Sequence, residues 1–451
     1  MKLPAEIFKA YDIRGIAGKT LTCDIVQAIG RAIGSEAISR GQREIAIGRD
    51  GRLSGPELIG SLALGIRESG MDVIDLGCIT TPMAYFAAFH LGTRSAVMLT
   101  GSHNPPEYNG IKIVLDQEAL HDEAIQALRQ RIEDEDFAHG SGSYRTQDIG
   151  PAYIDRIAAG IRINRPMKIA IDCGNGAAGA YAGRLFRRLG CEVRELYCEV
   201  DGHFPNHHPD PSVPENLADL VAAMEDSEIG LAFDGDADRL GVVSREGNII
   251  NPDRLLMLFA TDVLSRNPHR KVIFDVKCTG RLFGWIRDHG GEPLMWKTGH
   301  SLIKAKMRET DAVLAGEMTG HIFFADRWYG FDDGLYSAAR LLELLSRNAT
   351  FDELPDAFST PELHIATREG ENHALLMALQ STADFPDALQ INRLDGLRVE
   401  YSYGFGLIRA SNTTPAIVVR FEADTETGLA RIMEDFRRML KESAPHLPLP
   451  F

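Results

Sequence analysis

Three aspartates, Asp234, Asp236 and Asp238, alternate with small residues in a loop that directly follows an apolar, strand-like run. Carboxylates at alternate positions of an irregular loop can all turn toward one cation, and an all-oxygen donor set favours a hard ion such as Mg²⁺ over zinc. An EF-hand has similar spacing, but Arg239 and Arg245 stand where that loop requires glycine and glutamate. The spacing leaves two interpretations, a magnesium site and a solvated acidic turn.

A serine and a histidine are adjacent in the loop TGSHNPPEYNG, residues 100–110, which follows the apolar run SAVML. Ser102 is a candidate nucleophile, but its loop lacks the G-x-S-x-G pattern of α/β-hydrolases. We also expect Ser102 and His103 to point apart, as neighbours on a loop usually do, which argues against a hydrolase pair. What the serine attacks or carries must follow from the other loops.

Two further loops carry groups suited to a phosphorylated sugar. Glu317 and Thr319, in GEMTGH, offer a carboxylate and a hydroxyl that suit vicinal sugar hydroxyls. The loop RASNTTP combines a guanidinium with hydroxyl and amide donors, which suits a phosphate monoester. Its candidate ligands are Arg409, Ser411, Asn412 and Thr413. An ordinary surface position is the alternative for the arginine.

The segment CGNGAAG, residues 173–179, matches the G-x-G-x-x-G pattern of a dinucleotide site between a predicted strand and a predicted helix. A dinucleotide site also needs one acidic residue at the end of the next strand, for which Glu199 and Asp201 are only approximate candidates. We therefore favour a tight turn that packs helix against sheet.

The apolar runs predict three successive α/β mixed-sheet domains followed by a smaller α+β domain with an antiparallel sheet. In the first domain, Ser54 and Glu57 have capping-box spacing at the start of a helix. The Gly/Ser-rich stretch 137–150 is predicted to be a linker. The predicted domain boundaries are 1–148, 149–249, 250–360 and 361–451.

Length and composition restrict the function classes. The chain has 451 residues, a formal net charge of −16 and six cysteines without CxxC pairs. The acidic balance argues against nucleic-acid and anionic-membrane partners, which need a basic face. The first residues contain no apolar signal region and no long uncharged apolar stretch follows, so we expect a cytoplasmic protein with reduced thiols.

Seven segments occur in order along essentially the whole chain: KAYDIRG, GRDGRLSG, TGSHNPPEYNGIK, DGDADRLG, KTGHSLIK, GEMTGHIFFADRWYGFDDG and RASNTTPAIVVRFEAD. In this combination the chain resembles the α-D-phosphohexomutase family, most closely its bacterial phosphomannomutase/phosphoglucomutase branch. The resemblance implies four domains around a central active-site cleft: a phosphoserine-loop domain, a metal-binding domain, a sugar-recognition domain and a C-terminal phosphate clamp. It implies interconversion of hexose 1-phosphate and hexose 6-phosphate through a 1,6-bisphosphate that reorients.

The resemblance also assigns roles. Ser102 is carried as a phosphoserine, and its phosphate and the three aspartates together hold Mg²⁺. Glucose 1,6-bisphosphate, or mannose 1,6-bisphosphate, is the expected activator and intermediate. Lys112 and His103 are our candidates for proton transfer, with His300 a further one, and Lys112 and Arg239 neutralise the moving phosphoryl group. Further expected site residues are Tyr11, Arg14, Lys277, Glu317, Thr319 and the loop from Arg409 to Thr413. For Tyr11 and Arg14 an amphipathic surface anchor is the alternative.

The chain departs from the family pattern at Ala237, where relatives usually carry glycine, and at Thr319, where they usually carry serine. The Ala237 methyl can be accommodated unless that residue has a positive φ. A phosphoglucosamine mutase is the nearest alternative, but Met318 stands where that branch has glutamine, and SNTTP replaces its SGTEP. A Mg²⁺-dependent phosphatase and a non-catalytic NAD-binding module are more distant alternatives. We expect a monomer, because one chain completes the cleft.

Overall fold

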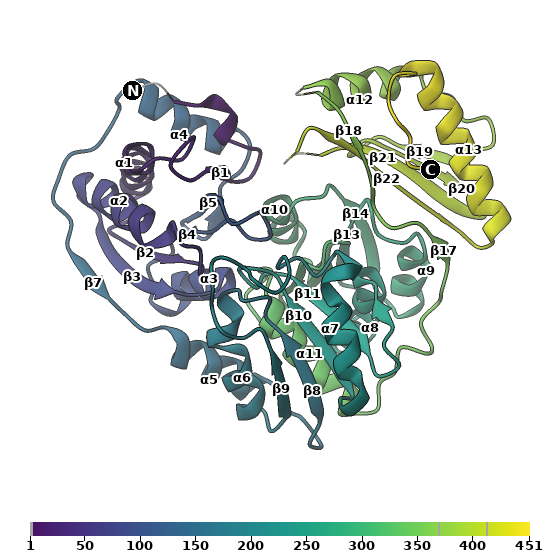
Figure 1. The fold of residues 1–451 in the computed structure, drawn as a ribbon, viewed down its shortest axis with the longest axis horizontal. Coiled ribbons are helices and arrows are strands. Elements are labelled where there is room, and N and C mark those ends of the chain that lie inside the picture. Colours follow the sequence, from purple (N-terminus) through teal and green to yellow (C-terminus); the bar gives the residue numbers. More distant parts are fainter. Residues whose placement is uncertain (1–2, 369, 412–413) are drawn as a thin grey trace.

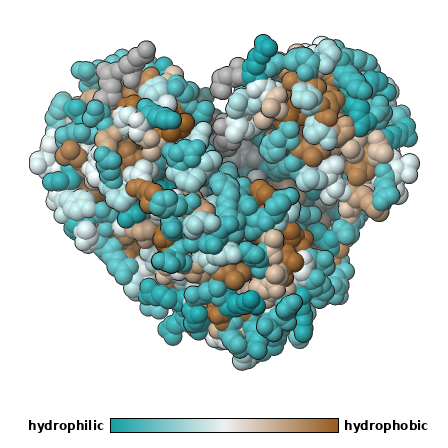
Figure 2. Space-filling model, in the orientation of Figure 1, coloured by the Kyte–Doolittle hydropathy of each residue, from teal (hydrophilic) through white to brown (hydrophobic). Residues whose placement is uncertain are grey.

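The computed structural model describes residues 3–368, 370–411 and 414–451, which form sheets of seven, five, four and six strands. The lobes that contain the first and last sheets face each other at the top of the molecule, and the two middle lobes join them below (Figure 1). The space-filling view is notched between the two upper lobes (Figure 2). The expected order of three α/β mixed-sheet domains and a smaller α+β domain is confirmed.

The first sheet has the order β1-β5-β4-β2-β3-β7, with β6 beside β5. Its strands are β1 (Ile13–Ile16), β2 (Glu44–Arg49), β3 (Asp72–Cys78), β4 (Ala96–Leu99), β5 (Tyr108–Leu115), β6 (Glu118–Ala119) and β7 (Tyr144–Thr146). The helices of this lobe are α1 (Cys23–Ser39), α2 (Gly55–Glu68), α3 (Thr81–His90) and α4 (Glu123–Glu133).

The second and third sheets have the orders β12-β11-β10-β8-β9 and β14-β13-β15-β16. The second lobe contains α5 (Gly150–Gly160), β8 (Lys168–Asp172), α6 (Ala182–Arg188), β9 (Glu192–Leu196), α7 (Ala218–Ala222), β10 (Ile229–Phe233), β11 (Leu240–Ser244) and β12 (Ile249–Ile250). The third contains α8 (Pro252–Arg266), β13 (Lys271–Asp275), α9 (Arg281–Asp288), β14 (Glu292–Trp296), α10 (His300–Thr310), β15 (Leu314–Gly316), β16 (Ile322–Phe324) and α11 (Gly334–Leu345).

The first three sheets share one four-strand pattern. Four consecutive strands of each sheet are arranged in the same way, in the orders β5-β4-β2-β3, β11-β10-β8-β9 and β16-β15-β13-β14. In each set the strand that comes last in the sequence pairs antiparallel with the strand before it in the sequence, and the other pairs are parallel. In each set the loop from the third strand to the fourth carries predicted site residues: Ser102, the three aspartates, and Glu317 with Thr319. One topology therefore supplies three site loops, although the sequence shows no residue-level repeat.

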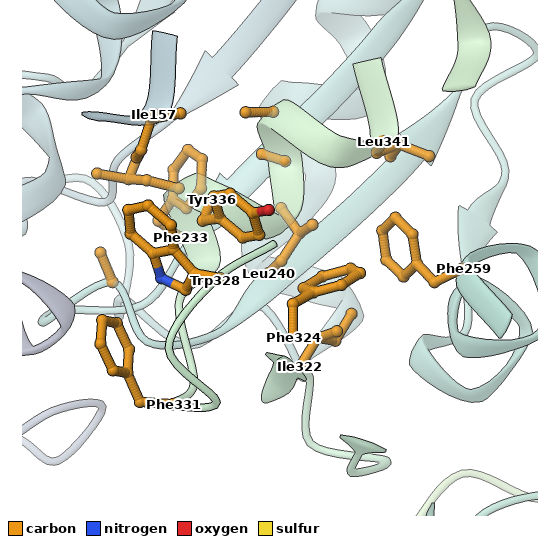
Figure 3. Packing of buried hydrophobic residues seen from close by; sticks show 14 of the residues in the cluster. Ile157, Phe233, Leu240, Phe259, Ile322, Phe324, Trp328, Phe331, Tyr336 and Leu341 are labelled. Atoms are coloured by element: carbon orange, nitrogen blue, oxygen red, sulfur yellow. The ribbon is translucent and has the colours of Figure 1, made fainter. Parts of the chain in front are cut away.

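A continuous apolar core joins the second and third lobes and reaches α3 of the first. Trp328 stacks on Tyr336 of α11 with ring centroids 4.3 Å apart, and Phe324 of β16 meets Tyr336 edge to face at 5.5 Å. Phe233 of β10 and Leu240 of β11 lie beside these rings (Figure 3). Because β10, β11, β15 and β16 flank the site loops, this shared core fixes those loops relative to one another.

The fourth lobe has an antiparallel sheet with the order β17-β22-β21-β20-β19, and β18 also pairs with β22. Its elements are β17 (Phe358–Ser359), β18 (Leu363–Ala366), α12 (Glu371–Thr382), β19 (Gln390–Asn392), β20 (Leu397–Tyr401), β21 (Gly404–Ala410), β22 (Ala416–Ala423) and α13 (Glu426–Ser443). Its core cluster is separate from that of the other lobes. None of the helices in the described ranges has the length and apolar character that a membrane span requires.

Two local expectations were wrong. The stretch 137–150 is not only a linker, because its residues 144–146 form β7 and pair in parallel with β3. Ser54 precedes α2 but its side chain does not cap that helix, and its Oγ instead accepts a hydrogen bond from Asn109 Nδ2 at 2.9 Å. Both differences arise from long-range pairing that short sequence patterns do not contain.

Candidate active site

Loops from all four lobes line one cavity of about 200 Å³. The predicted residues on its wall are Tyr11, Arg14, Ser102, His103, Lys112, Arg239, Lys277, His300, Glu317, Thr319, Arg409 and Ser411. The three aspartates are fully buried behind Ser102. Asn412 and Thr413 were also predicted to bind phosphate, but they lie outside the described residues. The structure thus gathers residues from both ends of the sequence, such as Tyr11 and Arg409, around one cavity.

Ser102 has a left-handed backbone, with φ 48°, at the point where β4 ends. Its Oγ donates to Asp234 Oδ2 at 2.8 Å, and its backbone N–H donates to Thr100 Oγ1 at 2.8 Å. His103 Nδ1 lies 3.2 Å from Ser102 Oγ, so the expectation that the two side chains point apart was wrong. The unusual φ of Ser102 places both side chains on the same side of the turn.

The Ser102 loop is held by Arg52, a fully buried residue that sequence analysis did not single out. The guanidinium donates to the carbonyl oxygens of Ser102 at 2.8 Å and Asn104 at 2.6 Å. It also donates to the carbonyls of Pro105 and Tyr108 and to Asp50 Oδ2 at 3.2 Å. A Cβ on Gly101 would lie 2.3 Å from this guanidinium, so only glycine admits it there. The motif GRDGRLSG contains Arg52 but does not reveal this contact.

The Asp234–Asp236–Asp238 loop is suited to a divalent cation. One carboxylate oxygen of each residue lies within 4.8 Å of the others, and all three residues are buried. Within the described chain, Asp236 Oδ1 is buried without a hydrogen-bond partner. Burial and the charges of Asp236 and Asp238 raise the pKa of Asp234 well above its usual value. An unpartnered oxygen and crowded carboxylates are what a bound hard cation would satisfy, so the donor set fits Mg²⁺.

Two cations lie against the same aspartates. Lys112 Nζ donates to Asp236 Oδ2 at 2.7 Å and to Asp238 Oδ2. Burial disfavours its charge, but the two carboxylates outweigh burial and raise the pKa of Lys112 well above its usual value. His321 lies 3.1 Å from Asp238 and 2.9 Å from Glu317, and although burial opposes its charge, these carboxylates raise its pKa to about 9. Both residues are therefore cationic near neutral pH.

Two further histidines of the cavity, His103 and His300, are neutral. Burial, together with Arg239 and Arg14, lowers the pKa of His103 well below its usual value. Burial and Lys304 do the same for His300. Lys304 Nζ lies 3.2 Å from His300 Nδ1 and donates to Asp332 Oδ1 at 2.7 Å. Because an ammonium has no lone pair, it must donate to Nδ1, which leaves the proton of His300 on Nε2.

The fourth lobe supplies the opposite wall of the cavity. Arg409 Nε donates to Asp395 Oδ2 at 3.1 Å, and Lys277 Nζ donates to Glu362 Oε1 at 2.6 Å. Arg409 and Lys277 each keep further N–H donors for a ligand, since one carboxylate bond does not use every donor. Arg14 Nη1 donates to Asn104 Oδ1 at 2.8 Å, beside the Ser102 loop, rather than anchoring an exposed surface.

Two arginines of the fourth lobe reach into the loop that carries Lys277. Arg398 Nη1 donates to the carbonyls of Val276 at 2.6 Å and Cys278 at 2.7 Å, and Arg420 Nη1 donates to the carbonyl of Lys277. Both guanidiniums are fully buried. The position of Lys277 therefore depends on β20 and β22 as well as on its own lobe.

Ala237 is fully buried and has φ 59°, the positive value at which its methyl group is unfavourable. An alanine in this region costs about 1–2 kcal/mol relative to a right-handed conformation. Its N–H donates to the Asp234 carbonyl at 3.0 Å, and its carbonyl accepts from Gly334 N at 3.1 Å. These bonds hold a strained residue in the middle of the aspartate loop.

Comparisons with known proteins agree with this geometry. The chain is 57% identical over 456 residues to a phosphomannomutase/phosphoglucomutase of Pseudomonas aeruginosa, covering 100% of this chain and 98% of that protein. It is 57% identical over 454 residues to a phosphoglucomutase of Neisseria gonorrhoeae, covering 99% and 98%. The crystal structure of a phosphoglucomutase/phosphomannomutase family protein from Burkholderia thailandensis superimposes with a TM-score of 0.95 at 55% identity over 100% of both chains.

Family models describe the chain segment by segment. Models of phosphoglucomutase/phosphomannomutase alpha/beta/alpha domains I, II and III match residues 5–139, 151–247 and 251–360, and the model of the C-terminal domain matches residues 353–439. The four models follow one another in order, and each matched segment contributes residues to the cavity wall. With its folds, its site loops and its relatives in agreement, the chain belongs to the phosphoglucomutase/phosphomannomutase family, a bacterial branch of the α-D-phosphohexomutases.

Proposed function

We propose that the chain interconverts hexose 1-phosphates and hexose 6-phosphates, with mannose and glucose phosphates as substrates. The observation that carries this proposal is the arrangement of one cavity: a serine hydroxyl 2.8 Å from a triple carboxylate on one wall, and the cations Arg409 and Lys277 on the other. One wall suits a phosphoryl group in transfer and the other suits a second phosphate that does not react.

In this proposal Ser102 is carried as a phosphoserine, and Asp234, Asp236 and Asp238 hold Mg²⁺ together with its phosphate. The ion, when bound, withdraws negative charge from the phosphoryl group. Lys112, whose Nζ donates to Asp236 and Asp238, neutralises the phosphoryl oxygens and stays a candidate for proton transfer at the sugar hydroxyl. Arg239, whose pKa is raised by Asp210 and Asp234 against the effect of burial, adds a second fixed positive charge.

Each half-reaction breaks one bond of phosphorus to oxygen and forms another. When phospho-Ser102 gives its phosphoryl group to the free hydroxyl of a hexose 1-phosphate, that hydroxyl loses a proton and Ser102 Oγ gains one. Neutral His103, 3.2 Å from Oγ, is the group we assign to proton exchange at the serine. The resulting glucose or mannose 1,6-bisphosphate reorients and returns its other phosphate to the serine, which releases the 6-phosphate.

Reorientation requires a clamp that accepts either phosphate. Arg409, Ser411, Asn412 and Thr413 form the proposed clamp, Tyr11, Arg14 and Lys277 flank it, and Glu317, Thr319 and His300 contact the sugar. The predicted extents 1–148, 149–249, 250–360 and 361–451 then act as the phosphoserine-loop, metal-binding, sugar-recognition and clamp domains. We also propose that the protein is a monomer, since one chain lines the cavity, and that it is located in the cytoplasm.

The test follows phosphorus directly. Purified protein with Mg²⁺ and a trace of glucose 1,6-bisphosphate is incubated with mannose 1-phosphate, glucose 1-phosphate or glucosamine 1-phosphate, and ³¹P NMR records sugar phosphates and free phosphate. We expect 6-phosphates from the first two without release of phosphate, loss of conversion in Ser102→Ala, and full conversion in Ser39→Ala, an exposed serine at the end of α1. Conversion of the amino sugar alone, or phosphate release independent of Ser102, would contradict the proposal.

A further inference from the structure

Two thiols of the second lobe are in direct contact. Cys198 Sγ donates to Cys173 Sγ across 3.3 Å, and it also lies 3.5 Å from the carbonyl oxygen of Leu196. Cys173 is buried at the end of β8, whereas Cys198 is partly exposed just after β9. Among the described residues, the other cysteines have no thiol partner of this kind: Cys23, Cys78, Cys191 and Cys278.

The backbone around both thiols is held in register. Cys173 N donates to the Leu196 carbonyl at 3.1 Å, and Asn175 N donates to the Tyr197 carbonyl at 2.8 Å. Asn175 and Tyr197, which this last bond joins, both have left-handed φ values, 59° and 52°. A disulfide needs its sulfurs about 2.05 Å apart, which asks for an approach of little more than 1 Å that side-chain rotation can begin.

We propose that Cys173 and Cys198 are a thiol–disulfide exchange site that takes low-molecular-weight disulfides, such as glutathione disulfide, and that its oxidation lowers the activity of the enzyme. The Cys198 thiolate attacks the external disulfide, forming a mixed disulfide and releasing one thiolate. The Cys173 thiolate then attacks Cys198 Sγ and displaces the second. Two electrons pass to the external disulfide, and the two protons lost by the cysteines convert its halves to thiols.

The order of attack follows from the surroundings of each sulfur. Cys198 is the thiol that an external disulfide can reach, because Cys173 is fully buried. The neighbouring thiol of Cys198, which competes for the same proton, and burial both raise the pKa of Cys173 well above its usual value. The second step therefore depends on loss of a proton from Cys173, and the intramolecular disulfide forms faster as the pH rises.

The coupling to activity runs through the aspartate loop. Gly176 N donates to the Cys173 carbonyl at 2.7 Å, and the next residue, Ala177, donates from its N–H to the Gly235 carbonyl at 3.0 Å. Gly235 lies between Asp234 and Asp236, and a Cβ on Gly176 would come within 2.8 Å of the Gly235 oxygen. The two loops have no space between them, so a shift of Cys173 moves the peptide that aims the carboxylates. If the carboxylates move by about 1 Å, the approach that the disulfide requires, the rate of the reaction should fall about tenfold or more.

Formation of the disulfide between Cys173 and Cys198 is tested without any measurement of activity. Native wild-type protein is equilibrated with glutathione disulfide at pH 7 and pH 8.5, blocked with N-ethylmaleimide and digested with trypsin without reduction. Cleavage separates Cys173 in peptide 169–184, Cys191 in peptide 189–194 and Cys198 in peptide 195–239. We expect peptides 169–184 and 195–239 to be joined, with faster formation at the higher pH. Wild-type protein that keeps these peptides separate, or joins either of them to peptide 189–194 instead, would overturn the proposal.

The functional part rests on the proposed mutase activity and is measured separately on the same samples. We expect conversion of glucose 1-phosphate to fall about tenfold as the linkage forms and to return with dithiothreitol. Cys198→Ala should keep its basal activity and lose its response to glutathione disulfide, while Cys191→Ala should respond like the wild type. A fully linked protein with unchanged activity would refute the coupling, and protein that links its peptides but never converts the sugar phosphate would instead refute the proposed function.

Discussion

Arg52 is the residue on which the geometry of the Ser102 loop depends most. Its guanidinium contacts four main-chain carbonyls of residues 102–108 and the Asp50 carboxylate. Arg52→Met keeps a long apolar stem in the same space but removes every one of these donors. We expect a protein that folds with reduced stability and a reaction that is far slower, because the serine hydroxyl loses its fixed position.

The expected losses of stability and of kcat follow from the contacts that remain when Arg52 is replaced by methionine. Asp50 would keep hydrogen bonds from Thr100 Oγ1 at 2.7 Å, Gly101 N at 3.1 Å and Arg52 N at 3.0 Å. It would lose its one direct ion pair while buried, a loss that typically costs about 3–5 kcal/mol. Asn104 and Tyr108 are only partly buried and Pro105 is exposed, so water can hydrate their carbonyls after the change and we add little for them. Unfolding free energy should fall by about 3–5 kcal/mol, and kcat by about 100-fold for a displacement near 1 Å.

The assay compares urea unfolding and steady-state conversion of glucose 1-phosphate in Arg52→Met, Arg52→Lys and Arg49→Met. Arg49 is the matched control, because it is partly buried nearby but donates to one carbonyl, that of Asp50, at 3.0 Å. Arg52→Lys should be intermediate in stability yet slow, since one ammonium cannot span the loop. If Arg52→Met keeps its unfolding free energy within about 1 kcal/mol and its kcat within about threefold, Arg52 does not position the serine.

Three further changes test other parts of the site. Ala237→Gly relieves the positive φ at a cost in unfolded-state entropy, so unfolding free energy should rise by about 0.5–1 kcal/mol; a decrease in urea unfolding experiments would mean that the methyl group is favourably packed. Lys304→Met removes the donor to His300 Nδ1, and ¹⁵N NMR of the imidazole should then show loss of the pure Nε2–H form; an unchanged spectrum would show that Lys304 does not select the tautomer. Burial raises the pKa of Asp333 to about 7, well above the usual range of an aspartate. Between about pH 4 and pH 7 the folded protein therefore holds a proton that the unfolded chain has released, and stability falls as pH rises, on the order of 1 kcal/mol per pH unit. Asp333→Asn should flatten this slope in urea titrations, and an unaltered slope would assign the pH dependence to other groups.

Local sequence patterns predicted the lobes and the loops that carry Ser102, the three aspartates, Glu317 and Arg409, because these loops directly follow apolar strands. The other predicted residues of the cavity wall came from the resemblance to the family: Tyr11, Arg14, Lys112, Arg239, Lys277 and His300. Alternation of strand and helix patterns reports burial, which is encoded within a few residues of each position. The aspartate loop was recognisable for the same reason, since its ligand spacing is local. Arg409 and Ser411 were recognisable because they lie two positions apart where β21 ends.

What the sequence did not reveal depends on contacts between distant segments. Arg52 approaches residues 102–108 only after β2 and β4 pair, and Cys173 approaches Cys198 only after β8 and β9 pair. The contact of Ser102 with His103 depends on a backbone φ that the residue types do not favour. The different charges of His103, His300 and His321 arise from burial and from charged groups distant in the sequence or on the same element, and could not be inferred from their motifs.

The bonds from Arg398 and Arg420 to the carbonyls of residues 276–278 make the last lobe part of the architecture of the third. A chain shortened at residue 360 would retain every residue of the sugar-facing loops, yet three buried carbonyl oxygens would lose their donors and Lys277 would lose its support. Deletion of the C-terminal lobe is for that reason no measure of what the phosphate clamp contributes. A chimera that borrows this lobe from a relative must bring both arginines with it, or it will alter a loop whose own sequence was left untouched.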